Sequence, residues 1–182
     1  MKIFKSGILL LLLGSSLTAS AQSLVPEKRS SFGIGPSIGY DYKLQGFSYG
    51  ANMMYEYRIN SHWAAFAALN YEQTIKNINH AAYFNTVGGQ WYHHVASANL
   101  GMRYYFDKFY MSGSLGLGYD NKKITLDDGW KINDVNGFGL HRSFGFGYQF
   151  DLRNQDALEV EVGVSGTNAS MKSMATFRYL FR

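Results

Sequence analysis

The most constraining feature of the sequence is a two-residue alternation of side chains that recurs in eight segments of about ten residues. The segments are 32–42, 47–58, 62–73, 94–106, 109–120, 138–150, 157–165 and 172–182. Successive side chains of a β-strand point to opposite faces of a sheet, so each segment is predicted to be a strand with two unlike faces. One face comprises 45 positions, and only Arg142 among them is charged. The other face is rich in glycine, serine and asparagine and carries nine charges, on Asp41, Glu56, Arg58, Glu72, Arg103, Asp120, Glu159, Glu161 and Arg178.

The uncharged face is predicted to meet lipid rather than water. A soluble barrel of the lipocalin type has the reverse arrangement, with an apolar cavity and a polar exterior. Hydrocarbon also requires every backbone polar group to be paired, which a closed barrel achieves. Aromatic residues near segment ends, such as Tyr55 and Tyr57 or Tyr104 and Phe106, are typical of the girdles at membrane interfaces. The pattern therefore predicts an all-β, eight-stranded antiparallel up-and-down transmembrane barrel.

The expected connections differ in length. Those after the second, fourth and sixth segments are short, whereas residues 74–93 and 121–137 form two long connections. Outer-membrane barrels have short periplasmic turns and longer extracellular loops. An N-terminus on the periplasmic side would place both long connections outside the cell.

The first 21 residues have the form of a cleaved signal peptide. Lys2 and Lys5 precede a short apolar run, and small residues end at Ala21. We expect residues 1–21 to be the signal peptide, 22–31 a periplasmic N-terminal segment and 32–182 the barrel domain. Loss of the two lysines lowers the formal net charge from +4 to +2, so the basic balance does not indicate a nucleic-acid partner.

Several kinds of site are excluded by composition. The chain has no cysteine, and therefore no disulfide, thiolate metal ligand or lipid-modified N-terminal cysteine. His93 and His94 are adjacent, so a strand would direct them to opposite faces, away from a common metal ion. We predict neither a metal site nor a cofactor.

Two stretches resemble a known family. The run Asn99-Leu100-Gly101-Met102-Arg103-Tyr104-Tyr105-Phe106 and the ending Phe177-Arg178-Tyr179-Leu180-Phe181-Arg182 are similar to strands of small eight-stranded outer-membrane barrels of Gram-negative bacteria, the porin-family type that includes OmpX, opacity proteins and the OmpA transmembrane domain. This resemblance implies an outer-membrane location. It also implies that Phe177, Tyr179 and Phe181 contact the barrel assembly machinery, although Arg182 follows the usual terminal aromatic residue.

The charges on the inner face suggest an ionic network in the lumen. The set comprises Glu56, Arg58, Arg103, Glu159, Glu161 and Arg178, and a last turn centred near residues 168 and 169 places Glu159 opposite Arg178. An eight-stranded barrel has an interior just wide enough for its side chains. These ions are expected to plug the barrel, to gate a narrow passage, or to form a satisfied polar core without a transport role.

Arg142 is the exception on the lipid-facing side. It lies about nine residues above the short turn near Asp151, close to the expected outer rim, where a cation costs little. There it would contact lipopolysaccharide phosphates or be solvated by water.

A catalytic alternative rests on His141 and Ser143, which resemble the His/Ser arrangement of lipid A deacylases, in which imidazole activates serine. Phe144 departs from that family's pattern, and alternation directs both side chains into the lumen.

Three functions follow from these observations. The favoured one is a non-enzymatic structural or surface-interaction barrel with an extracellular ligand at residues 74–93 and 121–137, because long loops on a rigid scaffold commonly carry binding sites. The alternatives are a narrow passive channel and a lipid A-modifying enzyme.

Overall fold

A computed structural model describes residues 29–78, 89–126, 131–153 and 155–182, and within these ranges the side chains of 78 and 132–135 are not described. The expected signal peptide, residues 1–21, lies outside the described residues, as does most of the expected periplasmic segment, residues 22–31. No helix in the described ranges is long and apolar enough to cross a membrane.

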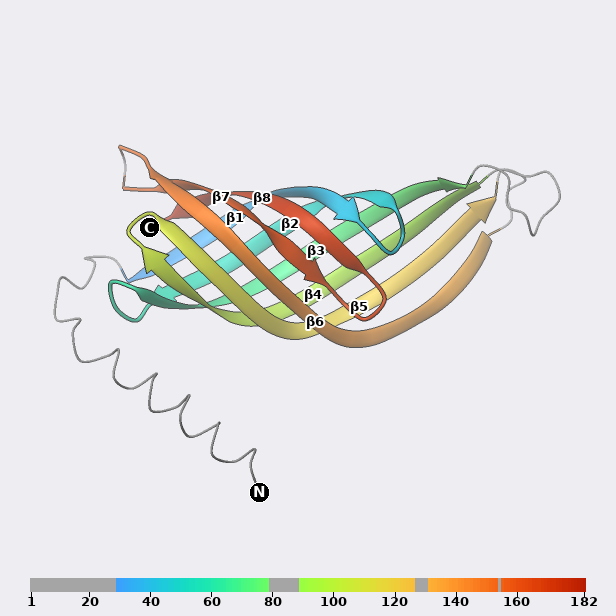
Figure 1. The fold of residues 1–182 in the computed structure, drawn as a ribbon, viewed down its shortest axis with the longest axis horizontal. Helices are drawn as coiled ribbons and strands as arrows, with labels where there is room; N and C mark the ends of the chain where they lie inside the picture. Colours follow the sequence, from blue (N-terminus) through green and yellow to red (C-terminus); the bar gives the residue numbers. More distant parts are fainter. Residues whose placement is uncertain (1–28, 79–88, 127–130, 154) are drawn as a thin grey trace, which may run out of the picture.

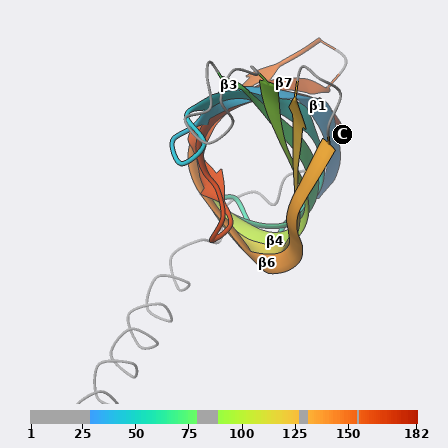
Figure 2. The ribbon, with the colours of Figure 1, turned by 90° about the vertical axis from the view of Figure 1, so that its right-hand side faces the viewer.

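The described residues form eight strands in chain order (Figure 1). They are β1 (Ser30–Asp41), β2 (Gly46–Arg58), β3 (Trp63–Ile78), β4 (Gly89–Phe106), β5 (Phe109–Leu126), β6 (Lys131–Asp151), β7 (Ala157–Gly166) and β8 (Met171–Phe181). Each strand pairs antiparallel with the next, and β1 pairs with β8, which closes the ring seen end-on in Figure 2. The predicted fold class, an eight-stranded antiparallel up-and-down barrel, is confirmed.

The pairing of β1 with β8 forms the seam of the barrel. Its register runs from Phe32 opposite Phe181 to Asp41 opposite Lys172, with a break at residues 35 and 36. Pro36 has no backbone N–H to donate, and proline is found in sheets at edges and irregularities. The seam is therefore a shorter and less regular ladder than the pairing of β4 with β5, which continues from Gly89 to Phe106.

The two faces of the strands are sorted as the alternation predicts. Large apolar side chains are exposed on the outside of every strand, whereas almost all buried polar and charged side chains lie inside. Aromatic residues meet in pairs at both margins of the apolar surface, among them Tyr104 with Phe106 and Tyr119 with Phe138. The exterior is thus an apolar belt with aromatic margins, as expected of a surface in contact with lipid.

The two ends of the barrel differ. Arg182, the tight turns at 59–62 and 107–108, and the end of β6 at Asp151 lie at one end, which we call the turn end. The connections 42–45 and 167–170, the last residues of β3 and β5 and the first residues of β4 and β6 lie toward the other, which we call the loop end. Asp107 has a φ of 61°, a left-handed conformation that aspartate tolerates better than most residues and that permits a two-residue turn.

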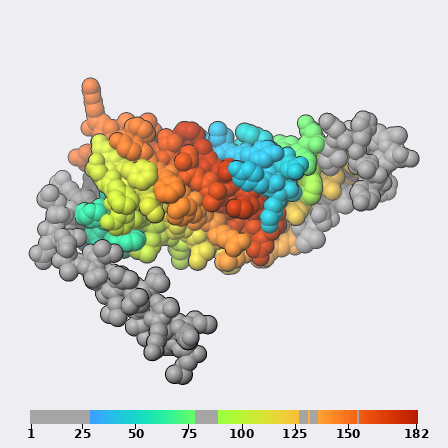
Figure 3. Space-filling view, in the orientation of Figure 1, coloured from blue at the N-terminus to red at the C-terminus, as the bar shows by residue number. Residues whose placement is uncertain are grey.

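The barrel wall is much taller on one side. We call β3 to β6 the tall wall and β7, β8, β1 and β2 the low wall. The last residue of β7, Gly166, pairs with Arg142, so residues 131–141 of β6 continue past it, about 36 Å of strand at 3.3 Å per residue. In Figure 3 the blue and red atoms of the low wall stop short of the green and yellow atoms of the tall wall.

This finding corrects the prediction that residues 74–93 and 121–137 are two long loops. Residues 74–78 and 89–93 belong to β3 and β4, and 121–126 and 131–137 belong to β5 and β6. The alternation of apolar and polar residues in the sequence stops before the strands end, because polar residues occupy both faces of the strands beyond the apolar belt. A register shift between Asp120 and Lys122 also changes the alternation there.

Candidate functional site: an ionic network across the lumen

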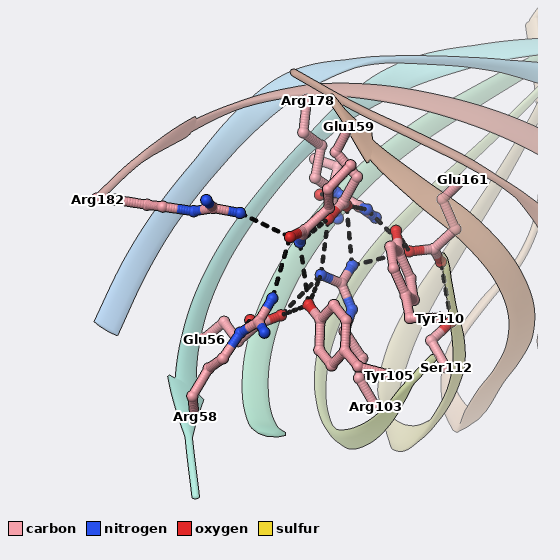
Figure 4. A network of polar contacts seen from close by, with 12 residues as sticks. Glu56, Arg58, Arg103, Tyr105, Tyr110, Ser112, Glu159, Glu161, Arg178 and Arg182 are labelled. Carbon is pink, nitrogen blue, oxygen red and sulfur yellow. Dashed lines mark hydrogen bonds and ion pairs between the residues drawn. The ribbon is translucent and has the colours of Figure 1, made fainter. Parts of the chain in front are cut away.

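The turn-end half of the lumen is filled by an ionic network, shown in Figure 4. Its centre is Arg103 on β4, which is almost fully buried. The Arg103 guanidinium donates two hydrogen bonds to the two carboxylate oxygens of Glu159, both at 2.9 Å. It also donates to Glu56 and to Glu161, each at 2.8 Å. One cation therefore joins three carboxylates from β2 and β7.

Arg178 on β8 completes the set of charges. Its Nη1 donates to Glu159 at 2.5 Å and to Glu161 at 2.9 Å, and its Nε donates to Asn52. Arg58 lies 3.5 Å from Glu56. Three glutamates and three arginines thus balance in charge, which offsets the large cost of removing such groups from water.

Two tyrosines add neutral hydrogen-bond donors to the network, although the buried Nε of Arg103 has no partner among the described residues. The Tyr105 hydroxyl donates to Glu56 at 2.7 Å, and the Tyr110 hydroxyl donates to Glu161 at 2.8 Å. The two rings also lie beneath cations, with Arg58 3.8 Å from the Tyr105 centroid and Arg103 4.2 Å from that of Tyr110. The aromatic residues therefore shield and fix the charges.

The network crosses the whole lumen. Arg58 on β2 donates to Gln149 on β6, four strands away around the ring, at 3.0 Å. Gln149 in turn donates to Tyr105 and Glu159, both at 3.0 Å. A bridge between opposite strands divides the interior, so we call these residues, together with Arg103, Arg178, Glu56, Glu161 and Tyr110, the plug.

The plug residues occupy inward-facing positions of their strands, and a glycine on a neighbouring strand leaves space for one of them. A Cβ built on Gly147 of β6 would lie 2.2 Å from the Tyr110 ring and hydroxyl. The missing side chain at 147 is thus what allows the Tyr110 ring to lie against β6 and reach Glu161.

A small polar chamber lies on the loop-end side of the plug. Its volume is about 60 Å³, and its lining includes Asn52, Asn70, Glu72, Ser114, His141 and Ser143. At about 10–15 Å³ of such volume per molecule, the chamber has room for about four water molecules. Lys172 crosses this region to donate to Glu72 at 2.9 Å.

A second cluster lies at the loop-end mouth. His93 Nε2 lies 2.8 Å from Asp120, and the Thr167 hydroxyl donates to the same carboxylate oxygen at 3.1 Å. Thr167 comes from the 167–170 connection and packs against Gly118, where a Cβ would lie 2.9 Å from its methyl group. The connection is thereby held over the mouth of the lumen.

The candidate catalytic pair is not assembled as a pair in the described contacts. His141 and Ser143 both face the lumen, but His141 Nδ1 lies 2.8 Å from Asn99 and the Ser143 hydroxyl lies 2.7 Å from Ser114. The two carboxylates that could approach His141 have other partners, since Asp120 contacts His93 and Glu72 contacts Lys172.

His93 and His94 point to opposite faces. His93 is buried inside, whereas the His94 ring lies outside and its Nδ1 is 2.9 Å from the Tyr71 hydroxyl. Among the described residues, no group of three or more histidine, aspartate or glutamate side chains is arranged so that it could hold a metal ion.

Sequence reasoning missed several members of the plug. Tyr105, Tyr110 and Gln149 are uncharged, and a search for charges on the inner face passed over them. The available signal was position, because all three occupy the inward phase of their strands.

Comparison with known proteins identifies the fold. No protein-family model and no curated protein sequence matches the chain. Among solved structures, the attachment invasion locus protein Ail of Yersinia pestis is 19% identical, with a TM-score of 0.58 over 86% of this chain and 100% of that one. The same protein in complex with the heparin analogue sucrose octasulfate is 20% identical, with a TM-score of 0.57 over the same shares. The N-terminal barrel domain of Pseudomonas aeruginosa OprF is 12% identical, with a TM-score of 0.52 over 83% of this chain and 97% of that one.

The chain therefore has the fold of the small eight-stranded outer-membrane barrels. The ladder is closed and the exterior is an apolar belt, which together meet the two requirements of a membrane-spanning sheet. The protein is a closed β-barrel whose exterior has the apolar character of a membrane-spanning sheet.

Proposed function

We propose that this protein is a non-enzymatic surface-interaction barrel whose lumen is closed and whose tall wall presents a binding surface outside the cell. The turn end faces the periplasm in this proposal, and the loop end faces outward. The height of the tall wall carries the proposal, because a barrel that served only to span the membrane would not need strands far longer than the membrane requires.

Charge on the tall wall suggests what it binds. Beyond the apolar belt, its described strand segments 74–78, 89–93, 121–126 and 131–137 contain four lysines and one aspartate in sequence. The lysines are Lys76, Lys122, Lys123 and Lys131, and Asp127 and Asp128 between β5 and β6 reduce the net charge of residues 74–93 and 121–137 to +1. An anionic ligand such as a sulfated saccharide suits the lysines of the strands, and sucrose octasulfate is the ligand in the complex of the Yersinia pestis neighbour.

Binding of fluorescent heparin to the protein in lipid nanodiscs tests the proposal. We expect saturable binding that weakens as salt rises from 50 to 300 mM, because salt screens exposed charges beyond about 8 Å at physiological ionic strength. The triple substitution Lys122→Gln, Lys123→Gln, Lys131→Gln should abolish it. Lys108→Gln at the turn end is the matched control and should bind normally. Equal binding by both variants, or none by the unaltered protein, contradicts the proposal.

A narrow passive channel is the second candidate, because the polar chamber next to the plug is wide enough for water. In this alternative the plug is a gate. Planar-bilayer recording distinguishes the two functions. If the unaltered protein conducts no ions and neither Glu159→Ala nor Arg178→Ala changes this, the plug is not a gate. If either substitution produces a steady conductance, the plug is what closes a channel through the lumen.

A further inference from the structure

An unpaired cation lies on the lipid-facing side of the barrel. The Arg142 side chain is exposed on the outer face of β6 and has no hydrogen-bond or ion-pair partner among the described residues. On the lipid face of a barrel an arginine costs about 2–4 kcal/mol at the bilayer midplane but only about 0–1 kcal/mol near the interface. Its position opposite Gly166, where β7 ends, places it at the loop-end margin of the low wall.

A groove adjoins this arginine. Its volume is about 280 Å³, and it lies between β6 and the 167–170 connection. Lys43, from the connection between β1 and β2, lines the same groove and donates to the backbone carbonyl of Asn168. Two cations from distant parts of the sequence therefore border one hollow, and none of the described residues that line it is a carboxylate.

The remainder of the groove is largely apolar. Phe144 and Val164 continue it along the barrel wall toward the apolar belt, and Met171 borders it from β8. Ser143, Thr167 and Ser170 also line the groove, but their hydroxyls bond Ser114, Asp120 and Asp41 inside the barrel. The hollow thus has a cationic end beside an apolar side.

We propose that this groove binds a phosphorylated lipid of the outer leaflet, with its phosphate between Arg142 and Lys43 and an acyl chain along Phe144 and Val164. The planar guanidinium of Arg142 suits a phosphate, since it can donate two parallel hydrogen bonds to two phosphate oxygens. Lys43 contributes a second charge and retains N–H groups beyond the one that contacts Asn168. The site rests on the proposed orientation, in which the loop end faces the outer leaflet.

Lipid retention by the purified protein tests this site. Protein in detergent micelles is mixed with bisphosphorylated lipid A, and the bound lipid is counted by native mass spectrometry. We expect Arg142→Gln and Lys43→Gln each to reduce retained lipid A about tenfold, the scale of one charge-assisted contact. Arg142→Lys, which keeps the charge but loses the paired donors, should retain an intermediate amount.

The controls separate phosphate recognition from general affinity for lipid. Arg153→Gln removes a cation at the turn end and should retain lipid A as the unaltered protein does. Dephosphorylated lipid A should be retained poorly, and millimolar inorganic phosphate should not displace lipid A, because the acyl chain contributes to binding. Equal retention by Arg142→Gln and Arg153→Gln, or of lipid A with and without phosphate, overturns the site. Heat-modifiable gel mobility shows that each variant is folded.

Orientation is measured separately, so that the two proposals fail independently. Binding in micelles does not depend on which way the protein is inserted. Labelling of intact cells with a membrane-impermeant amine reagent reports whether Lys43 at the loop end is outside. Labelling of Lys108 but not Lys43 would overturn the proposed orientation and leave the micelle result intact.

Discussion

Arg103 and Glu159 face each other across the lumen in a two-pronged ion pair, with both nitrogen–oxygen distances at 2.9 Å. Glu159 is fully buried and accepts four hydrogen bonds, from two nitrogens of Arg103, from Arg178 and from Gln149. Glu159→Ala should lower the free energy of unfolding by about 3–5 kcal/mol, because it leaves two arginines buried without their main acceptor. Urea unfolding in micelles, followed by tryptophan fluorescence, measures the loss.

Glu161→Gln provides the comparison for this substitution. Glu161 is at the more open edge of the plug, and a glutamine there can still accept a hydrogen bond from Tyr110 while its amide NH2 donates to the Ser112 hydroxyl. We expect a smaller loss than for Glu159→Ala. A loss below about 1 kcal/mol for Glu159→Ala would mean that water or rearrangement replaces the ion pair.

Gly147 should tolerate no side chain while Tyr110 is present. A methyl group at 147 would lie 2.2 Å from the tyrosine ring, so Gly147→Ala should destabilise the barrel by about 1–3 kcal/mol through overpacking. Gly113→Ala is the control, because a Cβ at 113 has no atom within 4 Å and β-strands disfavour glycine. Unfolding measurements should show no loss for Gly113→Ala, and equal losses at both positions would contradict the packing argument.

We expect the stability of the protein to depend on alkaline pH through the exposed ion pair of Lys108 and Asp151 at the turn end. The hydrogen bond from Lys108 to Asp151, at 3.1 Å, and the attraction between the two charges raise the pKa of Lys108. A raised folded-state pKa stabilises the protein below the ordinary lysine pKa of 10.5, and this contribution is lost as pH rises through the folded-state value. Asp151→Asn should therefore destabilise the protein more at pH 9 than above the folded-state pKa of Lys108, where only the ion pair of Asp151 with Arg182, at 2.9 Å, is left to lose.

Salt provides the check on this pair. Both side chains are close to half exposed, so the effect should be small and should shrink at 0.5 M salt. A difference between the two proteins that is constant from pH 9 to pH 12 would show that Asp151 acts through packing or through Arg182 instead.

The 167–170 connection should loosen when its hydroxyl anchor is removed. Thr167 donates to Asp120 and accepts from the backbone amide of Ala169, at 3.2 Å. Thr167→Val preserves shape but removes both contacts, so hydrogen exchange of the Ala169 amide should accelerate. Exchange in β4 and β5 should not change. Unaltered exchange at Ala169 would indicate that Ser170 alone, through its hydrogen bond to Asp41, holds the connection.

The alternation of side chains predicted the barrel because lipid imposes a strict rule on one face. Phe144 and Phe146 must be apolar and the intervening Gly145 must be small, so that strand can be identified from the sequence. Beyond the belt both faces meet polar surroundings, and consecutive lysines such as Lys122 and Lys123 no longer mark a strand. The tall wall could therefore not be predicted.

Some of the ion pairs inside the lumen could be predicted from the sequence. Glu159 and Arg178 are neighbours in a hairpin, so the turn position fixes their register. The contacts of Arg103 join β4 to β7, and their geometry depends on the tilt and closure of the whole ring. No local pattern encodes that relationship.

The seam between β1 and β8 has a consequence for how the chain reaches its native state. Phe32 and Phe181 are paired although 148 residues separate them, and the ladder between them is interrupted at residues 35 and 36. Bringing such distant segments together costs loop-closure entropy before any contact compensates for it. We expect hairpin formation to come first and closure last, and the same seam to part first when the barrel comes under tension.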